Sequence, residues 1–424
     1  MTTKTRRDFL KTSAVAGGAL AANLNMLGNV HAGGNDLIKV GLIGCGGRGS
    51  GAVEQNLRAD SNNKLVAVGD AFRDRAEGVL AGLRRNSAVR DKVDVPAERV
   101  FVGLDAYTRV IENCDLVILA TPPGFRAQQI AAAVRARKHI FTEKPVCVDG
   151  PAARLCLEMY TQANRDRLAI VAGTQRRYQT SYTESMKRIH DGAIGTITSA
   201  RCSWNQGSLW HRERTAQMTD LEWQLRNWLY FTWLSGDHIV EQHVHNLDVI
   251  NWALGNSHPV KAIGLGGRQV RTGPEFGQIF DHFALDLEYP NGAHVLSMCR
   301  QIPNCANSVS EAITGTKGGW TSGGHRITGD NPWTFGRGRD NEPYQEEHVA
   351  LYRSIRQGMP INDLKNVTES SLTAVLGRTA CYTGKEITWD QMLNSTTNMM
   401  PANLAWDMQL PVTPVAVPGR TELR

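Results

Sequence analysis

The sequence lacks any uninterrupted apolar run of the roughly 20 residues that a helix needs to cross a bilayer. It also lacks a strong excess of charge of one sign, because 47 lysines and arginines stand against 41 aspartates and glutamates. A surplus this small and this dispersed argues against nucleic acid as a partner. We therefore expect no membrane span and no nucleic-acid partner.

Paired cysteine motifs, internal repeats and low-complexity linkers are absent as well. The eight cysteines are scattered, with no Cys-x-x-Cys pair. Several lie in strand-like or helical runs, where thiols usually act as small buried hydrophobes, and we predict no disulfides. The 424 residues, 41% of them hydrophobic, are enough for two to three domains with large cores.

The first 32 residues resemble an export signal. "TRRDFLK" at 5–11 carries twin arginines, a modest apolar run follows, and "VHA" ending at Ala32 offers a small-residue cleavage site. The alternative is an ordinary amphipathic N-terminal helix. The fuller match predicts export of the folded protein to the periplasm through the twin-arginine pathway.

A glycine-rich turn predicts a dinucleotide site. An apolar strand at 38–43 runs into Gly44, Gly46 and Gly49, which fit G-x-G-x-x-G and precede a helical stretch. Such glycines allow a tight turn, close approach of a pyrophosphate and helix–strand packing, and the helix N-terminus offers free N–H groups to the phosphates. Arg48, inside the turn, is a further expected cofactor contact.

A second strand, "KLVAVGD", ends at Asp70, 21 residues after Gly49. A carboxylate at this distance can accept the ribose hydroxyls of the adenosine half, which favours NAD over NADP. Arg73 and Arg75 lie close enough to hold a 2′-phosphate instead, so NADP stays possible.

Strands and helices continue to alternate, which predicts a parallel sheet with helices on both faces and ligands at the carboxyl ends of its strands. "DLVILATPP" at 115–123 and "HIFTEKP" at 139–145 are the next strands. The nicotinamide half is expected at their ends, near these residues: Thr121, Pro122, Pro123, Glu143 and Lys144.

The glycine turn, "ATPP", "EKP" and the His-x-x-Asp stretch at 245–248 together resemble the glucose–fructose oxidoreductase / inositol dehydrogenase family (Gfo/Idh/MocA), from about Asp36 to the end. The resemblance implies an α/β fold: an N-terminal Rossmann domain and a C-terminal α/β domain with an open, largely antiparallel sheet. That second domain carries the substrate pocket and often an oligomer interface, so a homo-oligomer, dimer or tetramer, is expected. Most members oxidise or reduce a hydroxyl of a sugar, cyclitol or related polyol, and some cleave glycosides through transient oxidation.

The resemblance also implies roles for single residues. Lys144 matches the family's catalytic lysine and His245 its catalytic histidine, and Glu143 is expected near the nicotinamide ribose. Four residues before the histidine the family usually has aspartate, where this chain has Glu241. The carboxylate is kept on a side chain longer by one methylene, which leaves its catalytic role open.

The residues around His245 predict a helix over 236–254. At about 100° per residue, one face would carry a single stripe: His238, Glu241, His245, Asp248 and Trp252. His243 would lean toward the opposite, apolar side, so His243 and His245 diverge and cannot chelate one ion. The stripe could be a two-His-one-carboxylate metal site, a structural polar face or a catalytic face; we favour catalysis and expect no metal.

Oxidation of an alcohol explains why such residues are needed. The hydroxyl proton must leave to a base within about 2.6–3.2 Å whose pKa lies near working pH, while a hydride moves to the nicotinamide. An unperturbed histidine, with a pKa of about 6.5, suits this. We predict that His245 is the base, that Lys144 positions or polarises the oxygen, and that Glu241 or Asp248 orients the imidazole. The reverse assignment of Lys144 and His245 stays open.

Substrate contacts are predicted from the types of residue that bind sugars, because tryptophan faces stack on sugar CH surfaces and arginines bind hydroxyls. The candidates are Arg176, Tyr178, Trp210, Arg226 and Asp248, with Arg212 and Asn227 as further possibilities. Of the six tryptophans between 204 and 252, about two are expected at substrate and the rest in a core or interface.

The predicted organisation is a signal peptide at 1–32, an NAD-binding Rossmann domain at 36–165, a substrate-binding and oligomerisation domain at 166–390 and a tail at 391–424. A C-terminal helix of the second domain is expected to pack back on the first. Strands are predicted within 258–270, 279–292 and 293–302, with a hairpin turn at 290–292. Residues 316–333 are predicted to be a loop-rich rim of the pocket.

These patterns predict an NAD(P)-dependent oxidoreductase that acts on a secondary hydroxyl of a sugar or glycoside. Since a periplasm supplies no free nicotinamide, an exported enzyme should hold its cofactor tightly and restore it in each turnover. Two alternatives remain: an NAD-dependent glycoside-cleaving enzyme that oxidises its substrate transiently, and a non-catalytic sugar-binding protein with a structural cofactor.

Overall fold

The computed structural model describes residues 36–336, 338 and 340–423. The predicted export signal at 1–32 lies outside these residues. Within the described part of the chain, no helix is long and apolar enough to cross a membrane.

The first part of the chain forms a six-stranded sheet in the order β3-β2-β1-β4-β5-β6, with every neighbouring pair parallel. Its strands are β1 (Ile38–Ile43), β2 (Asn63–Asp70), β3 (Val100–Val102), β4 (Leu116–Leu119), β5 (His139–Thr142) and β6 (Ile170–Ala172). The helices between them are α2 (Gly47–Arg58), α3 (Arg73–Arg85), α4 (Ala106–Glu112), α5 (Arg126–Arg135) and α6 (Gly150–Asp166). The order reverses between β1 and β4, which is where a doubly wound sheet opens a crevice for its ligand. The Rossmann prediction is confirmed.

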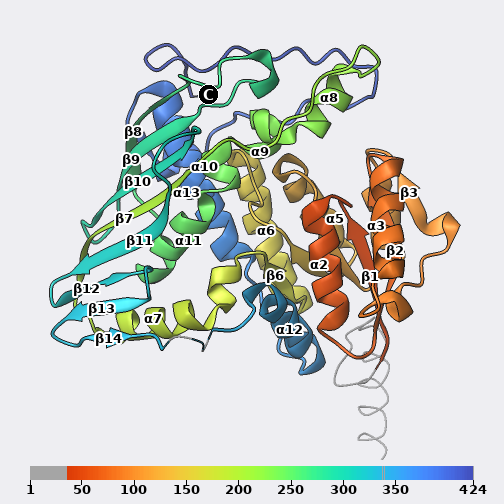
Figure 1. Cartoon of the computed structure of the whole chain (residues 1–424), viewed down its shortest axis with the longest axis horizontal. Helices are drawn as coiled ribbons and strands as arrows, with labels where there is room; N and C mark the ends of the chain where they lie inside the picture. The colour runs from red at the N-terminus through yellow and green to blue at the C-terminus, as the bar shows by residue number, and fades with distance from the viewer. Residues whose placement is uncertain (1–35, 337, 339, 424) are drawn as a thin grey trace, which may run out of the picture.

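The rest of the chain builds a nine-stranded sheet in the order β14-β13-β12-β11-β7-β10-β9-β8-β15 (Figure 1). Only the β7–β10 pair is parallel among these neighbours. Its strands are β7 (Ile197–Gln206), β8 (Lys261–Gly267), β9 (His282–Glu288), β10 (His294–Gln301), β11 (Ser308–Gly315), β12 (Gly318–Thr321), β13 (Arg326–Gly329), β14 (Trp333–Thr334) and β15 (Ile387–Thr388). This confirms the prediction of a second α/β part with a largely antiparallel sheet.

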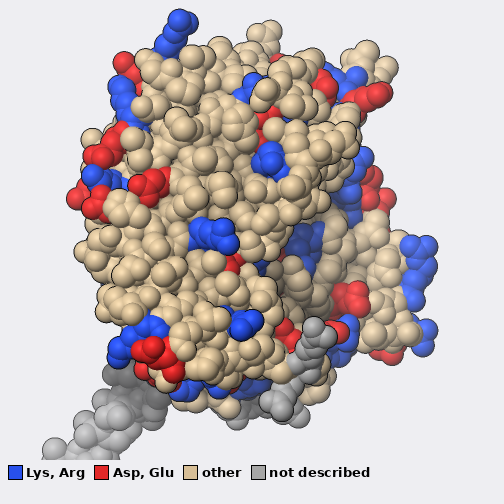
Figure 2. Space-filling model, turned by 60° about the vertical axis from the view of Figure 1, so that its left-hand side comes forward, with Lys and Arg blue, Asp and Glu red and all other residues tan. Residues whose placement is uncertain are grey.

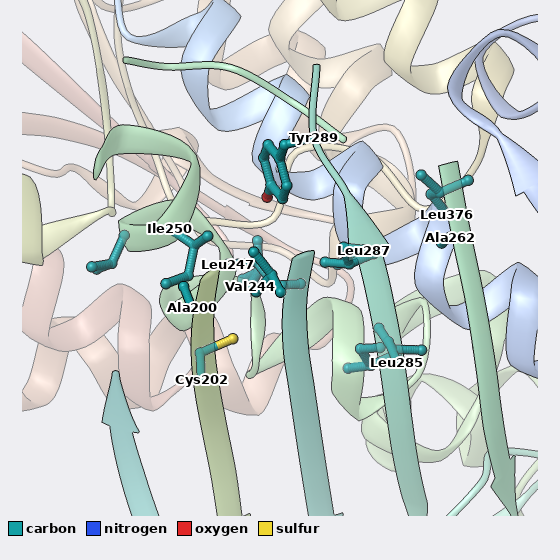
Figure 3. Close-up of a cluster of buried hydrophobic side chains, with 14 of the residues drawn as sticks. Ala200, Cys202, Val244, Leu247, Ile250, Ala262, Leu285, Leu287, Tyr289 and Leu376 are labelled. Carbon is teal, nitrogen blue, oxygen red and sulfur yellow. The ribbon is translucent and has the colours of Figure 1, made fainter. Parts of the chain in front are cut away.

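Two helices, α11 (Val244–Ala253) and α13 (Leu364–Thr383), lie against the strands on one face of the second sheet. The other helices of this part of the chain are α7 (Thr180–His190), α8 (Asp220–Arg226), α9 (Thr232–Ser235), α10 (His238–Glu241), α12 (Pro343–Arg356) and α14 (Trp389–Leu393). Figure 3 shows Val244 and Leu247 of α11 beside Leu287 of β9, with Leu285 farther along the same strand, and all four are buried. Burial alternates along β9, as expected for a sheet with one face in the core.

Two predictions about local structure are wrong. Residues 316–333 contain the strands β12, β13 and β14 rather than a loop, because Trp320 and Ile327 alternate with polar neighbours and are buried in the core. The single helix over 236–254 is divided into α10 and α11, with His243 capping the second. His243 is fully buried there and its Nε2 lies 2.7 Å from the Ser297 hydroxyl on β10.

Helix α12 joins the second part to the first by packing on α2. The Tyr352 hydroxyl donates to Asn56 Oδ1 at 2.7 Å, and the Arg356 guanidinium lies 2.8 Å from the Asp60 carboxylate. Such contacts agree with a helix that packs back on the Rossmann domain, while the predicted domain limits stay predictions.

Charged side chains are scattered over the surface. In Figure 2 the face that comes forward, on the side of the nine-stranded sheet, is mostly uncharged, with small separate groups of lysine, arginine and acidic residues. On β8, Ile263 and Leu265 are 53% and 79% exposed, and Leu296 on β10 and Val309 on β11 are each 47% exposed. The uncovered face of this sheet is therefore partly apolar.

Candidate active site

The turn after β1 is shaped to receive a phosphate group. Gly44 has φ +91°, and a Cβ there would lie 2.6 Å from the backbone of Ala120 and Thr121, while a Cβ on Gly49 would lie 1.9 Å from Gly44 O. A Cβ on Gly46, by contrast, would have no protein atom within 4 Å. The turn is thus tight on the protein side and open at the N-terminus of α2, as a dinucleotide requires.

Asp70 lies at the end of β2 beside this turn. Its carboxylate accepts hydrogen bonds from Cys45 N at 2.7 Å and from Phe72 N at 2.9 Å, so the backbone fixes its orientation. Burial raises the pKa of Asp70 above the ordinary range for aspartate. A carboxylate has further lone pairs to accept ribose hydroxyls, so the residues present fit NAD.

A cavity of about 500 Å³ runs along the ends of the first sheet. Its lining includes Gly44, Gly46, Arg48, Asp70, Thr121 and Pro122, which joins most of the predicted cofactor residues in one space. Pro123 is buried beside it. This volume is within the range of small-molecule and cofactor sites.

The ends of β4 and β5 are held together by Arg126, a residue that sequence analysis missed. Its buried guanidinium donates to the main-chain oxygens of Thr121 and Glu143, and burial lowers its pKa to about 10. An arginine at the start of a helix gives little sequence signal for such a role. Arg126 fixes the two turns at which the nicotinamide half was predicted.

Glu143 and Arg48 form an ion pair inside the site. Arg48 Nε lies 2.9 Å from Glu143 Oε1, and the Glu143 side chain is buried. Gly173, after β6, leaves room for this carboxylate, because a Cβ there would lie 2.4 Å from Glu143 Oε2. The glycine-rich turn and the end of β5 are therefore linked by charge.

Lys144 points from the end of β5 to the end of α10. Its ammonium donates to Glu241 O at 2.5 Å and lies 3.5 Å from Glu241 Oε1. The side chains of Lys144 and Glu241 are only 10% and 12% exposed. Two of the three predicted catalytic residues are thus in direct contact, although they come from opposite parts of the chain.

His245 lies in the first turn of α11, in the same region. Its ring stacks on Trp204 of β7, with centroids 5.9 Å apart. Burial, then the positive charges of Lys144 and Arg176, hold the pKa of His245 well below the usual 6.5. The imidazole is therefore neutral at pH 7, and within the described residues no protein group is hydrogen-bonded to its ring nitrogens.

The histidine stripe does not form a metal site in this structure. His238 faces the second sheet, with its Nε2 3.9 Å from Cys299 Sγ on β10 and its ring against Phe283 on β9. Across the described residues, no group of three or more His, Cys, Asp or Glu side chains is arranged to hold an ion. The break between α10 and α11 places His245 on a different helix from His238 and Glu241.

Three of the predicted substrate residues have protein partners. Asp248 pairs bidentately with Arg177 at 2.8 Å and accepts from Ser370 at 2.8 Å, and the Tyr178 hydroxyl donates to Asp363 at 2.6 Å. Arg176 lies 2.5 Å from Glu311 on β11 and over the Trp204 ring, close to His245. Arg176 is thus placed beside the predicted base, whereas Asp248 and Tyr178 brace the fold around it.

The other two predicted substrate residues lie elsewhere. Trp210 and Arg226 line the cavity next to Asp70, at the adenosine end rather than beside His245. Arg226 contacts Phe72 and Asp74, with its guanidinium 3.9 Å from the Phe72 ring centre. The residue types indicated that these side chains bind a ligand, but the sequence does not show which end of the cleft they reach.

Two family models match the chain. Residues 38–172 match an oxidoreductase family model with an NAD-binding Rossmann fold (GFO_IDH_MocA), and residues 182–321 match the GFO/IDH/MocA C-terminal domain. Together they account for well over half of the chain.

Curated relatives include inositol 2-dehydrogenase 4 of Saccharopolyspora erythraea, 30% identical over 52% of this chain and 55% of the relative. The 2,7-anhydro-N-acetylneuraminate hydratase of Escherichia coli is 27% identical over 42% of this chain and 43% of the relative. The chain spans about half the length of these relatives.

Solved structures share the fold over most of the chain. The aldose-aldose oxidoreductase of Caulobacter crescentus, complexed with glycerol, has a TM-score of 0.64 at 16% identity, covering 83% of this chain and 99% of that one. Scyllo-inositol dehydrogenase of Lactobacillus casei, with bound NAD(H) and scyllo-inositol, has a TM-score of 0.63 at 17% identity, covering 84% and 99%.

Proposed function

The chain belongs to the GFO/IDH/MocA oxidoreductase family with an NAD-binding Rossmann domain, and on that premise we propose that it oxidises a secondary hydroxyl of a sugar or glycoside. The observation that carries the proposal is the contact of Lys144, at the end of β5, with Glu241, together with the nearness of the Lys144 charge to the buried His245. When bound, the nicotinamide supplies the hydride acceptor.

His245 serves as the base in this proposal. Its pKa is held well below 6.5, so the ring is neutral and has a lone pair for the hydroxyl proton, but it is a weaker base than the unperturbed histidine that the sequence predicted. Stacking on Trp204 fixes the plane of the imidazole. Acceptance of a proton at His245 is opposed by Lys144 and Arg176, so the proton is readily returned when the substrate carbon is reduced again.

Lys144 binds the substrate oxygen and stabilises negative charge that develops there. Its ammonium is positioned by the carbonyl and the carboxylate of Glu241. Glu241 is therefore a positioning residue for Lys144 rather than for the imidazole. We propose Arg176, beside Trp204, as a group that binds a neighbouring hydroxyl of the substrate.

We further propose that the enzyme is exported by the signal at 1–32 and completes a redox-neutral cycle on a retained cofactor. Either a second sugar is oxidised or reduced in turn to restore the cofactor, or the transient oxidation allows the glycosidic oxygen to leave by elimination, after which water adds to the double bond and the oxidised carbon is reduced again. The second route is favoured by one relative, whose name is that of a hydratase rather than a dehydrogenase.

Absorbance of the reduced nicotinamide, recorded while sugars, inositols and glycosides are added to purified protein, tests these proposals. A signal that depends on added NAD indicates a dehydrogenase with an exchangeable cofactor. A bound signal that cycles while product accumulates indicates the redox-neutral enzyme. A bound cofactor that responds to none of these compounds contradicts the enzymatic proposal and leaves a sugar-binding protein.

The apolar outer face of the nine-stranded sheet supports a proposal of homo-oligomerisation. Leu265, on β8, is 79% exposed there. Light scattering after size-exclusion chromatography should give a dimer or tetramer, and Leu265→Lys should shift it toward monomer. A monomeric wild type would refute this proposal.

A further inference from the structure

The cofactor cavity has a second wall that does not come from the Rossmann part. The residues facing the ends of β2 and β3 are Trp210, Arg212, Leu225, Arg226 and Trp228, all from the segment between β7 and α9. This wall, residues 209–228, lies opposite Asp70, the residue placed to bind the adenosine ribose. The adenosine half of the site is therefore enclosed from both parts of the chain.

The wall is tied to the elements behind it. The Tyr230 hydroxyl donates to Trp210 O at 2.7 Å. Asn227, fully buried, accepts from Arg212 N at 2.6 Å and donates to Arg212 O at 3.0 Å. These bonds hold the irregular stretch at 209–212 against α8 and the 3-10 turn Trp228–Tyr230 (η5). The backbone of the wall is therefore fixed by hydrogen bonds to buried residues.

The wall also packs on the Rossmann part itself. Arg226 covers the Phe72 ring and pairs with Asp74 at the start of α3. On the other side of the cleft, Gly124 approaches the backbone of Trp233 so closely that a Cβ would lie 2.1 Å from Trp233 O. One apolar cluster includes side chains from the wall, from the Rossmann part and from the C-terminal tail.

The C-terminal tail crosses this junction and fastens the wall. Figure 1 shows the deep-blue tail running along the top of the molecule past α8. The Trp406 ring lies 5.6 Å from that of Phe72. Farther along, Leu410 N donates to Asp220 at 3.0 Å and Leu410 O accepts from Gln224 at 2.7 Å, both on α8.

We propose that residues 209–228 form the second half of the adenosine-binding site, and that the tail holds this wall closed so that the dinucleotide stays bound between turnovers. The inference rests on the proposed function, in which the cofactor is restored rather than exchanged. A dinucleotide leaving at this end would have to separate Arg226 and Trp406 from Phe72. Release should therefore be slow, and the wall and the tail should both control it.

The rate at which the protein releases bound NADH tests whether the wall and the tail retain the dinucleotide. Protein loaded with NADH is desalted and mixed with excess NAD and with lactate dehydrogenase and pyruvate, which oxidise only free NADH. The variants Trp210→Ala and Trp406→Ala are compared with Met359→Ala and with Val412→Ala in the tail. Trp210 and Trp406 are 46% and 37% exposed, so their truncation is compatible with folding, which the unfolding temperature without cofactor checks.

Wild type should keep NADH through desalting, and Trp210→Ala should release it about 5–30-fold faster, as expected for a lost aromatic contact worth one to two kcal/mol. Trp406→Ala should shift the rate in the same direction by less, and both controls should match wild type. Rapid loss from wild type, or equal rates in all variants, overturns the inference. Since no sugar is present, a protein that retains NADH but oxidises nothing contradicts only the proposed activity.

Discussion

The ammonium of Lys144 lies 2.5 Å from the main-chain oxygen of Glu241 and 3.5 Å from its carboxylate. Lys144 follows β5 of the first sheet, and Glu241 ends α10 against the second. The ion pair therefore holds the proposed catalytic lysine across the junction between the two parts of the chain. Any shift between these parts would move the ammonium relative to the cofactor.

Glu241→Gln should lower turnover by about tenfold, because the carbonyl still holds Lys144 while the opposing charge is lost. Glu241→Asp, which restores the residue usual in the family, should recover part of that loss. Steady-state rates with the best polyol substrate, together with NADH affinity, measure this. NADH affinity should stay unchanged, and a Gln variant as active as wild type would show that the carboxylate does not position the lysine.

His245→Ala and Lys144→Ala should each lower turnover by about 10²–10⁴-fold, the range for loss of a group that transfers or stabilises a proton in the transition state. His294→Ala, a substitution at a 58% exposed histidine on β10, is the matched control and should keep full activity. Rapid-mixing measurement of nicotinamide reduction isolates the chemical step. Near-normal rates in both site variants would refute the proposed mechanism.

Asp248→Asn should destabilise the fold by about 3–5 kcal/mol, because it leaves the Arg177 side chain, only 11% exposed, without the buried carboxylate that it pairs with. Urea unfolding provides the measurement. Asp191→Asn, which removes an exposed ion pair with Lys187, should change stability little. If Asp248 binds substrate as the sequence predicted, KM would rise while stability stayed near that of wild type.

Much of the fold was predictable because it depends on local patterns. The glycine turn, the acidic end of β2 and the alternation of strands and helices each reflect residues close together in sequence. The strands at 316–333 were missed since glycines and polar residues surround Trp320 and Ile327, and only tertiary burial makes these two side chains alternate. At the break after Glu241, the His243 ring is hydrogen-bonded to Ser297, 54 residues away in sequence, which no local pattern indicates.

Site residues were predictable from the sequence where they belong to a short motif. Their contacts with residues from distant segments were not. Lys144 and Glu241 were found by position, but their contact joins residues 97 apart. Nothing in the sequence indicates that Asp248 is engaged by Arg177, or that Arg226 faces the adenosine end of the cleft. Residue type predicts what a side chain is able to bind, whereas the packing of the two sheets decides what it reaches.

Asp70→Ser should weaken NAD binding and reduce discrimination against NADP. The carboxylate faces the position of the adenosine ribose, and a 2′-phosphate would be repelled by it. Arg75 lines the same cavity and would then be free to pair with that phosphate. The ratio of the dissociation constant for NADPH to that for NADH, measured by fluorescence titration, should fall toward one. An unchanged ratio would mean that another residue sets the preference.

Acid should destabilise the protein through its buried histidines, and His243 offers the clearest case. Burial, reinforced by the charge of Arg176, lowers its pKa in the folded state to about 3 from the ordinary 6.5. Below pH 6.5 the unfolded chain therefore takes up a proton that the folded chain does not. The free energy of unfolding should fall by up to about 1.4 kcal/mol per pH unit from this group as the pH drops from 6.5 toward 3.

Urea unfolding of wild type and His243→Asn at pH 6.5 and pH 5.0 tests this linkage. The variant lacks the titrating ring, so its stability should fall by about 1.6 kcal/mol less than that of wild type over this interval. Ser297→Ala is the matched control, because it removes the partner of His243 without removing a titrating group. That control should be less stable than wild type at both pH values with the same pH dependence. An equal pH dependence in His243→Asn would mean that the imidazole is already accessible to protons in the native state, and that burial does not keep it neutral.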